Sequence, residues 1–177
     1  MKHSVSIFLI FLTLSCKIFS QTSGNRSVAI SLPVVTLMDI EPSGAISLNY
    51  TAPSEAGNAV TAPASNSSKW INYTSAIAPS GLARRITASV NQTIPGIDIK
   101  IMAAVATGSG GGTLGVPSPQ ITLTTSAQTI ISGIGGAFTG NGANNGHQLI
   151  ITLGINNYSN LDARSNTPVI ITYTITE

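Results

Sequence analysis

Charged residues are scarce in this chain: only 8% of its 177 residues are Asp, Glu, Lys or Arg. Lys2 and Lys17 lie in the first twenty residues, and without that segment six basic residues face six acidic ones, so the formal charge is zero. Nucleic acids and anionic membranes are bound by clustered Lys and Arg. Arg84-Arg85 is the only cationic pair, and we interpret it as a solvated strand edge. We therefore expect no nucleic-acid partner.

Cysteine and histidine are nearly absent as well. Cys16 is the only cysteine, and His147 is the only histidine beyond the first twenty residues. Zinc sites need a Cys/His cluster and EF-hand calcium sites need regularly spaced oxygen ligands, and neither pattern occurs. Asp98 beside Gly96 is the one weak candidate for a metal site in a loop. We expect no metal, no cofactor and no disulfide framework.

Catalytic patterns are missing too. No serine lies in a G-x-S-x-G elbow, and Asp39 with Glu41, the nearest carboxylate pair, falls at an expected solvated strand end. Residues 110–115 match G-x-G-x-x-G by letters, but the prolines at 117 and 119 prevent the helix that a dinucleotide site requires. A flexible hairpin loop is the better interpretation. We expect that the protein is not an enzyme.

The first twenty residues have the pattern of a secretory signal peptide. Lys2 and His3 precede an apolar run over residues 5–14, and Ser20 supplies a small residue at the expected cleavage point. This apolar run is too short to span a membrane. Residues 13–16 are also a weak match to a lipoprotein box, so Cys16 either carries lipid or leaves with the signal. We expect a secreted protein with one domain over residues 21–177.

The rest of the chain alternates apolar and polar residues with a period of two, rich in Thr, Val, Ile and Tyr. Gly, Asn and Pro cluster between these segments, as expected for turns. The pattern predicts an all-β fold, an antiparallel immunoglobulin-like β-sandwich of about nine strands. The expected strands are residues 34–40, 45–50, 69–75, 85–90, 98–106, 120–124, 128–131, 149–155 and 169–176. We expect a surface loop over residues 51–68.

Aromatic residues allow two interpretations. Trp70, Tyr73 and Tyr158 would pack into the core of a sandwich, or they would be exposed and stack on sugar rings. The second interpretation leads to an alternative function, a monomeric surface adhesin or carbohydrate-binding module with a host or environmental glycan as its partner.

The last expected strand is the most regular. Val169, Ile171, Tyr173 and Ile175 lie on one of its faces, and polar residues alternate with them. Together with the signal peptide and the neutral Gly/Asn/Thr-rich composition, this strand resembles the immunoglobulin-like pilins of bacterial chaperone–usher systems, in particular the archaic, spore-coat-U-like branch.

The resemblance implies that each subunit lacks one strand and that the N-terminal extension of a neighbouring subunit fills the gap. Val28, Ile30 and Leu32, in residues 27–32, would be the inserted side chains of this donor strand, and the face formed by Val169, Ile171, Tyr173 and Ile175 would line the gap. It also implies a periplasmic chaperone or assembly platform and a place on the bacterial surface or in an extracellular filament.

Three features depart from the family's pattern. The disulfide of the archaic branch is absent, Arg164 and Thr176 replace the glycine and the penultimate aromatic of classical pilins, and Pro33 would interrupt a longer donor strand. Residues 27–32 could equally form the domain's own first strand. The leading expectation is a non-enzymatic structural subunit of an extracellular filament, pilus or surface layer, which associates with copies of itself or with homologous subunits by strand pairing.

Overall fold

A computed structural model describes residues 23–177, so the predictions on the signal peptide and on Cys16 lie outside the described residues. The chain divides into two compact units, Met1–Leu32 and Pro33–Glu177. In the first unit, residues 23–32 belong to no strand or helix, which does not support a first strand of the domain's own at residues 27–32. The described residues include no helix long and apolar enough to cross a membrane.

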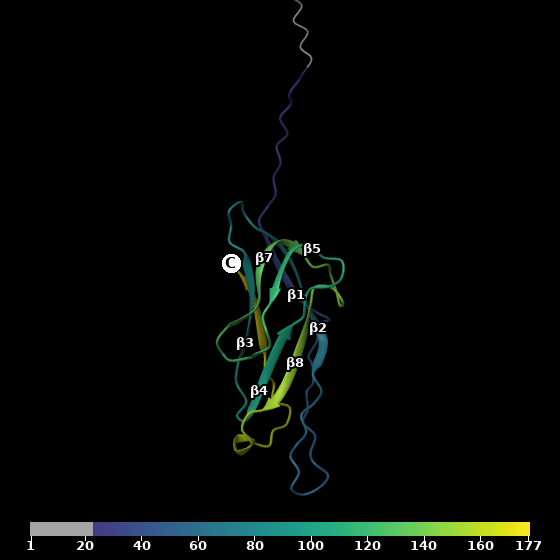
Figure 1. The fold of residues 1–177 in the computed structure, drawn as a ribbon, viewed down its shortest axis with the longest axis vertical. Coiled ribbons are helices and arrows are strands. Elements are labelled where there is room, and N and C mark those ends of the chain that lie inside the picture. Colours follow the sequence, from purple (N-terminus) through teal and green to yellow (C-terminus); the bar gives the residue numbers. More distant parts are fainter. Residues whose placement is uncertain (1–22) are drawn as a thin grey trace, which may run out of the picture. The chain divides into compact units, whose positions relative to one another are not determined.

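The second unit is built from β-strands, and every ladder between them is antiparallel (Figure 1). This confirms the predicted all-β fold, and eight of the nine expected strands recur with shifted ends. The nine strands of the described residues are β1 (Val35–Glu41), β2 (Asn66–Ala76), β3 (Arg84–Val90), β4 (Ile97–Ala103), β5 (Gly111–Pro117), β6 (Ile121–Thr122), β7 (Gln128–Phe138), β8 (His147–Ile155) and β9 (Ile171–Thr176). A short 3₁₀ turn, η1 (Tyr158–Asn160), follows β8.

The strands form two layers around one core. One layer has the order β1-β2-β8-β4-β6, and the other has the order β9-β3-β7-β5. The pairings β1-β2-β8-β4 and β3-β9 match the A-B-E-D and C-F pairings of immunoglobulin sandwiches. The described residues provide no strand at the G position of that fold, beside β9.

Strand β7 joins the two layers into one hydrogen-bonded path. Its first part pairs with β3 as far as Ile134, and its end pairs with β2 at Ala137 and Phe138. Within the first part the pairing register with β3 shifts between Ile131 and Ile134, and Gly133 there has a φ of 71°, which favours glycine. Both layers therefore share one apolar core.

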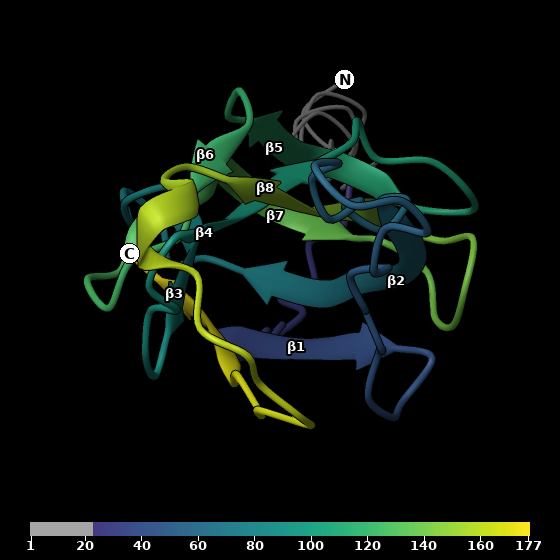
Figure 2. The ribbon, with the colours of Figure 1, turned by 90° about the horizontal axis from the view of Figure 1, so that it is seen from below.

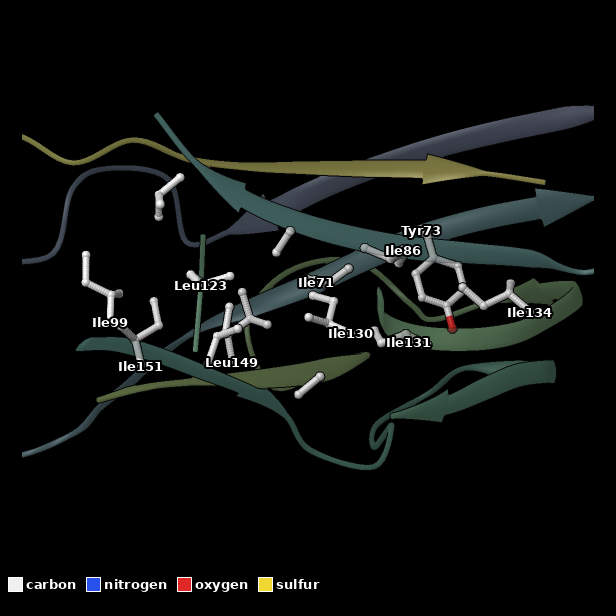
Figure 3. Packing of buried hydrophobic residues seen from close by; sticks show 14 of the residues in the cluster. Ile71, Tyr73, Ile86, Ile99, Leu123, Ile130, Ile131, Ile134, Leu149 and Ile151 are labelled. Atoms are coloured by element: carbon white, nitrogen blue, oxygen red, sulfur yellow. The ribbon is translucent and has the colours of Figure 1, made fainter. Parts of the chain in front are cut away.

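That core is dominated by isoleucine, whose branched side chain packs well between sheets (Figure 3). Inward and outward residues alternate along β3, as the period-two pattern predicted. The largest fully buried apolar side chains are Ile71, Ile86, Ile101, Ile130, Ile131, Ile134 and Leu149.

The prediction of a flexible loop at residues 110–115 is wrong, because most of this segment belongs to β5, which pairs with β7. Its glycines allow the two backbones to approach closely. A Cβ at Gly112 would collide with the carbonyl oxygen of Gly136, and one at Gly115 would lie 2.7 Å from Cγ1 of Ile134. Glycine here serves close strand packing rather than mobility.

The predicted strand over residues 45–50 is also wrong as a hydrogen-bonded strand. Ile46 and Leu48 pack against the core while their neighbours are exposed, so the predicted alternation is present. Within the described residues, however, no backbone hydrogen bond involves this segment. The segment has the side-chain pattern of a strand and lacks a partner strand.

Candidate interface at the open sheet edges

Strands β1 and β9 each have one unpaired edge. Among the described residues, β1 pairs only with β2, and β9 pairs only with β3. Both strands lie on the same side of the core in Figures 2 and 3, β1 in purple and β9 in yellow. An unpaired edge presents a row of free N–H and C=O groups that another strand can bind.

Arg84 fixes how the two edges are oriented. Its Nη1 donates to the carbonyl oxygen of Val35, the first residue of β1, at 2.6 Å and to Oγ of Ser75 at 2.9 Å. Its Nη2 lies 3.8 Å from Oε1 of Glu177, which directly follows β9. The start of β1 and the end of β9 therefore share one end of the sandwich, and the two strands run in opposite directions.

Arg84 was interpreted from the sequence as a solvated strand edge, and this is wrong: the residue is 3% exposed, whereas Arg85 is exposed as expected. Its hydrogen bonds to Val35 and Ser75 satisfy a buried cation. Because Glu177 is exposed at its side chain, that ion pair contributes less than the hydrogen bonds do.

The core is incompletely covered between the two edges. Among the described residues, eleven apolar residues are only partly buried although they pack against the core, and eight of them come from these edges. Met38 and Ile40 belong to β1, and Ile46 and Leu48 follow it. The other four are Val169, Ile171, Tyr173 and Ile175.

The C-terminal face was predicted from the sequence, and the structure places all four of its residues on the side that faces the core. Burial raises the pKa of the Tyr173 phenol above its ordinary value. On the opposite edge, the alternation of Ile46 and Leu48 continues to Tyr50, whose buried hydroxyl has no hydrogen-bond partner among residues 23–177. Burial, and then the negative charge of Asp98, raise the pKa of that phenol.

The predicted donor residues are the most exposed apolar side chains of the described part. Val28, Ile30 and Leu32 are 80%, 87% and 83% exposed. Because they alternate with smaller residues, they would point to one face if the segment formed a strand. An exposed apolar row of this kind is unusual unless another surface covers it.

The three aromatic residues do not form one sugar-binding face. Tyr73 is 3% exposed, so it does not offer a ring to a ligand, and its hydroxyl bonds to the carbonyl oxygen of Leu114 and lies 3.1 Å from Nε2 of His147. Trp70 is half-buried. Tyr158 is exposed, and its hydroxyl accepts a hydrogen bond from the Val60 amide at 3.3 Å.

The remaining candidates have structural surroundings. His147 is fully buried, with Nδ1 2.8 Å from the carbonyl oxygen of Ala104. Asp39 is exposed, and its Oδ1 accepts the amide of Ile40 at 2.7 Å. Asp98 accepts a hydrogen bond from Asn156 at 2.6 Å, and residues 23–177 contain no group of three acidic, histidine or cysteine side chains suited to a metal.

Sequence reasoning missed the residues of the β1 side of the interface. Met38, Ile40, Ile46 and Leu48 do alternate in the sequence, which could have indicated a second apolar row. The role of Arg84 had no sequence signal, because it depends on a contact with residues 49 and 93 positions away along the chain.

No protein family, curated protein or solved structure matches this chain.

Proposed function

We propose that this protein is a non-enzymatic structural subunit of an extracellular filament, pilus or surface layer, and that copies assemble by strand pairing. The observation that carries this proposal is the row of eight partly buried apolar residues along the open edges of β1 and β9. A strand inserted there would cover the core and give both edges their missing hydrogen bonds.

Residues 27–32 of a second copy have the chemistry of such a strand. Val28, Ile30 and Leu32 are exposed and would face the apolar row between the edges. Ala29 and Ser31 would face solvent. Pro33 has no amide hydrogen to donate, which marks the natural end of the inserted strand.

The orientation of the edges favours an open chain of subunits over a closed pair. A donated segment that runs antiparallel to β9 runs parallel to β1, so it leads away from the Arg84 end of its host. The donor's own β1 begins at the Arg84 end of the donor. Opposite ends of the two subunits therefore meet, and such a head-to-tail contact repeats from subunit to subunit, giving an open filament unless its rotation closes a ring.

A subunit would have to reverse its own chain to cover its edges. Its segment 27–32 directly precedes β1, so only Pro33 and Val34 would be left for the reversal. Two-residue hairpin turns favour Asn, Asp and Gly, which are absent from these two positions. Exposed edges of this kind also promote aggregation before assembly. A periplasmic chaperone or assembly platform would therefore cover them until the subunit reaches the bacterial surface.

Electron microscopy of the purified chain, beside a variant that begins at Pro33, tests the proposal. Filaments from the longer chain alone support strand donation by residues 27–32. Filaments from both chains would retain assembly and refute this donor segment. The longer chain is also tested with a periplasmic extract that contains the assembly machinery. If it still gives only folded monomers, the proposed role as a structural subunit is refuted.

A further inference from the structure

A hollow of about 380 Å³ lies on the outer face of the β1–β2 pair, at the end of β7. The residues that matter for its chemistry are Leu37, Asp39, Asn72, Thr74, Phe138 and Asn141. Met38 and Ile40, which alternate with Leu37 and Asp39, face the core. Met38 and Tyr73 also contribute to the lining, so the hollow opens on the outer face of β1 and meets the partly buried apolar row at Met38 alone.

Strand register brings the lining together. Thr74 lies between Leu37 on β1 and Phe138 on β7, and Asp39 is opposite Asn72. Directly opposite residues share one face of a sheet. Leu37 is 66% exposed and Phe138 is 52% exposed, so two large apolar side chains flank polar groups at the surface.

Asn72 provides an unmet hydrogen-bond acceptor beside the hollow. The residue is 5% exposed, and its Nδ2 donates to the carbonyl oxygen of Asn145 at 2.7 Å. Its Oδ1 is buried and has no hydrogen-bond partner. Buried acceptors are nearly always satisfied, so this oxygen calls for a donor that the described residues do not provide.

The hydrogen-bonding and charged groups that line the hollow indicate which class of ligand it can bind. Asp39 and Asn72 offer acceptor oxygens, Phe138 offers an aromatic face, and the lining contains no Lys, Arg or His. An anionic ligand would find no counter-charge there. A neutral sugar has hydroxyl donors for the acceptors and an apolar C–H face for the ring.

We propose that this hollow binds a neutral sugar unit of a surface or environmental glycan. Phe138 stacks on the sugar, Asp39 accepts its hydroxyl groups, and a hydroxyl bonds to Oδ1 of Asn72 once that buried oxygen is exposed to the ligand. Gly142 has positive φ and open space at its Cβ position, whereas a Cβ at Gly140 would lie 2.6 Å from Oγ of Ser109. Because the site uses the outer face of β1, it does not depend on strand donation.

Saturation-transfer NMR with cellohexaose, maltohexaose, laminarihexaose and mannohexaose as probes tests the site, since the method suits monomers and filaments alike. Phe138→Ala and Asp39→Asn change exposed side chains and should leave the fold intact, as thermal unfolding checks. Tyr158→Ala is the matched control, because it removes another exposed aromatic ring beside a different hollow.

At least one probe should bind the full chain, and Phe138→Ala should weaken that binding at least tenfold, with a smaller loss for Asp39→Asn. Tyr158→Ala should leave the affinity unchanged, and all three variants should assemble like the parent chain. The proposal is overturned if no probe binds, if Phe138→Ala binds as well as the parent, or if binding is lost only in Tyr158→Ala.

Discussion

Replacing Ile30 by Asp should abolish assembly and leave the subunit folded. Ile30 belongs to no strand and is highly exposed, so the substitution removes no contact from the core of the domain. Burial of a side chain of this size stabilises an interface by about 1.5–3 kcal/mol. A carboxylate facing the apolar row adds a desolvation cost above the roughly 3 kcal/mol upper figure for a neutral polar group.

These two terms give a loss of at least about 4 kcal/mol per subunit contact, which corresponds to an association constant at least about a thousandfold smaller. Sedimentation velocity at several concentrations measures this change directly. Urea unfolding of the unassembled subunit should give the same free energy of unfolding for the variant and the parent.

Ser31→Asp is the matched control, since it places the same charge one residue further along. In a strand, residues 30 and 31 point to opposite faces, so the aspartate at position 31 would face solvent. The donor-strand reasoning is refuted if Ile30→Asp assembles as the parent does, or if Ser31→Asp disrupts assembly as strongly.

Two further predictions concern the fold itself. Gly112→Ala should destabilise the subunit by more than about 1 kcal/mol in a urea titration, because the φ of 87° at Gly112 and the carbonyl of Gly136 leave no room for a side chain. Gly136→Ala is the control: the space around its Cβ position is open, so it should cost less than about 1 kcal/mol. Burial raises the pKa of Tyr73 and Tyr173 above the ordinary value of 10.0, so the neutral phenols contribute stability that is fully present below about pH 10 and is lost as pH rises through the folded-state pKa values. Urea unfolding at stepwise increasing pH should show this decline. Phenolate absorbance assigned to Tyr73 or Tyr173 by comparison with the Tyr73→Phe and Tyr173→Phe variants, and titrating near pH 10 in the native protein, would contradict it.

The sequence predicted those elements whose signal is local. Strand β9 alternates strictly between apolar and Thr residues, and the structure gives it the predicted orientation, with Ile171, Tyr173 and Ile175 toward the core. Binary alternation defines which face of a strand is buried, whichever strand lies beside it. The same alternation predicted the all-β fold. The prediction holds although the polar positions carry few charged residues.

Elements that depend on a distant partner were not predictable in this way. Three of the seven residues of β5 are glycine and the strand has no apolar period, yet it pairs because the glycines allow its backbone to approach β7 closely. Arg84 looks like a surface residue until Val35 and Glu177 are brought beside it. The hollow at Phe138 likewise combines three separate parts of the chain, and no short motif marks it.

Residues 45–50 have the local pattern of a strand but lack the distant partner, and assembly would provide that partner. Their alternation predicted a strand, and they pack against the core, but they lack backbone partners. A donated strand between the two edges would supply such a partner. We therefore expect the amides of residues 45–50 and of β9 to exchange with deuterium quickly in the unassembled subunit and at least tenfold more slowly in filaments. β4, whose ladder with β8 is already complete, is the internal control and should change little. Filaments that protect neither residues 45–50 nor β9 would show that the contact between subunits lies elsewhere.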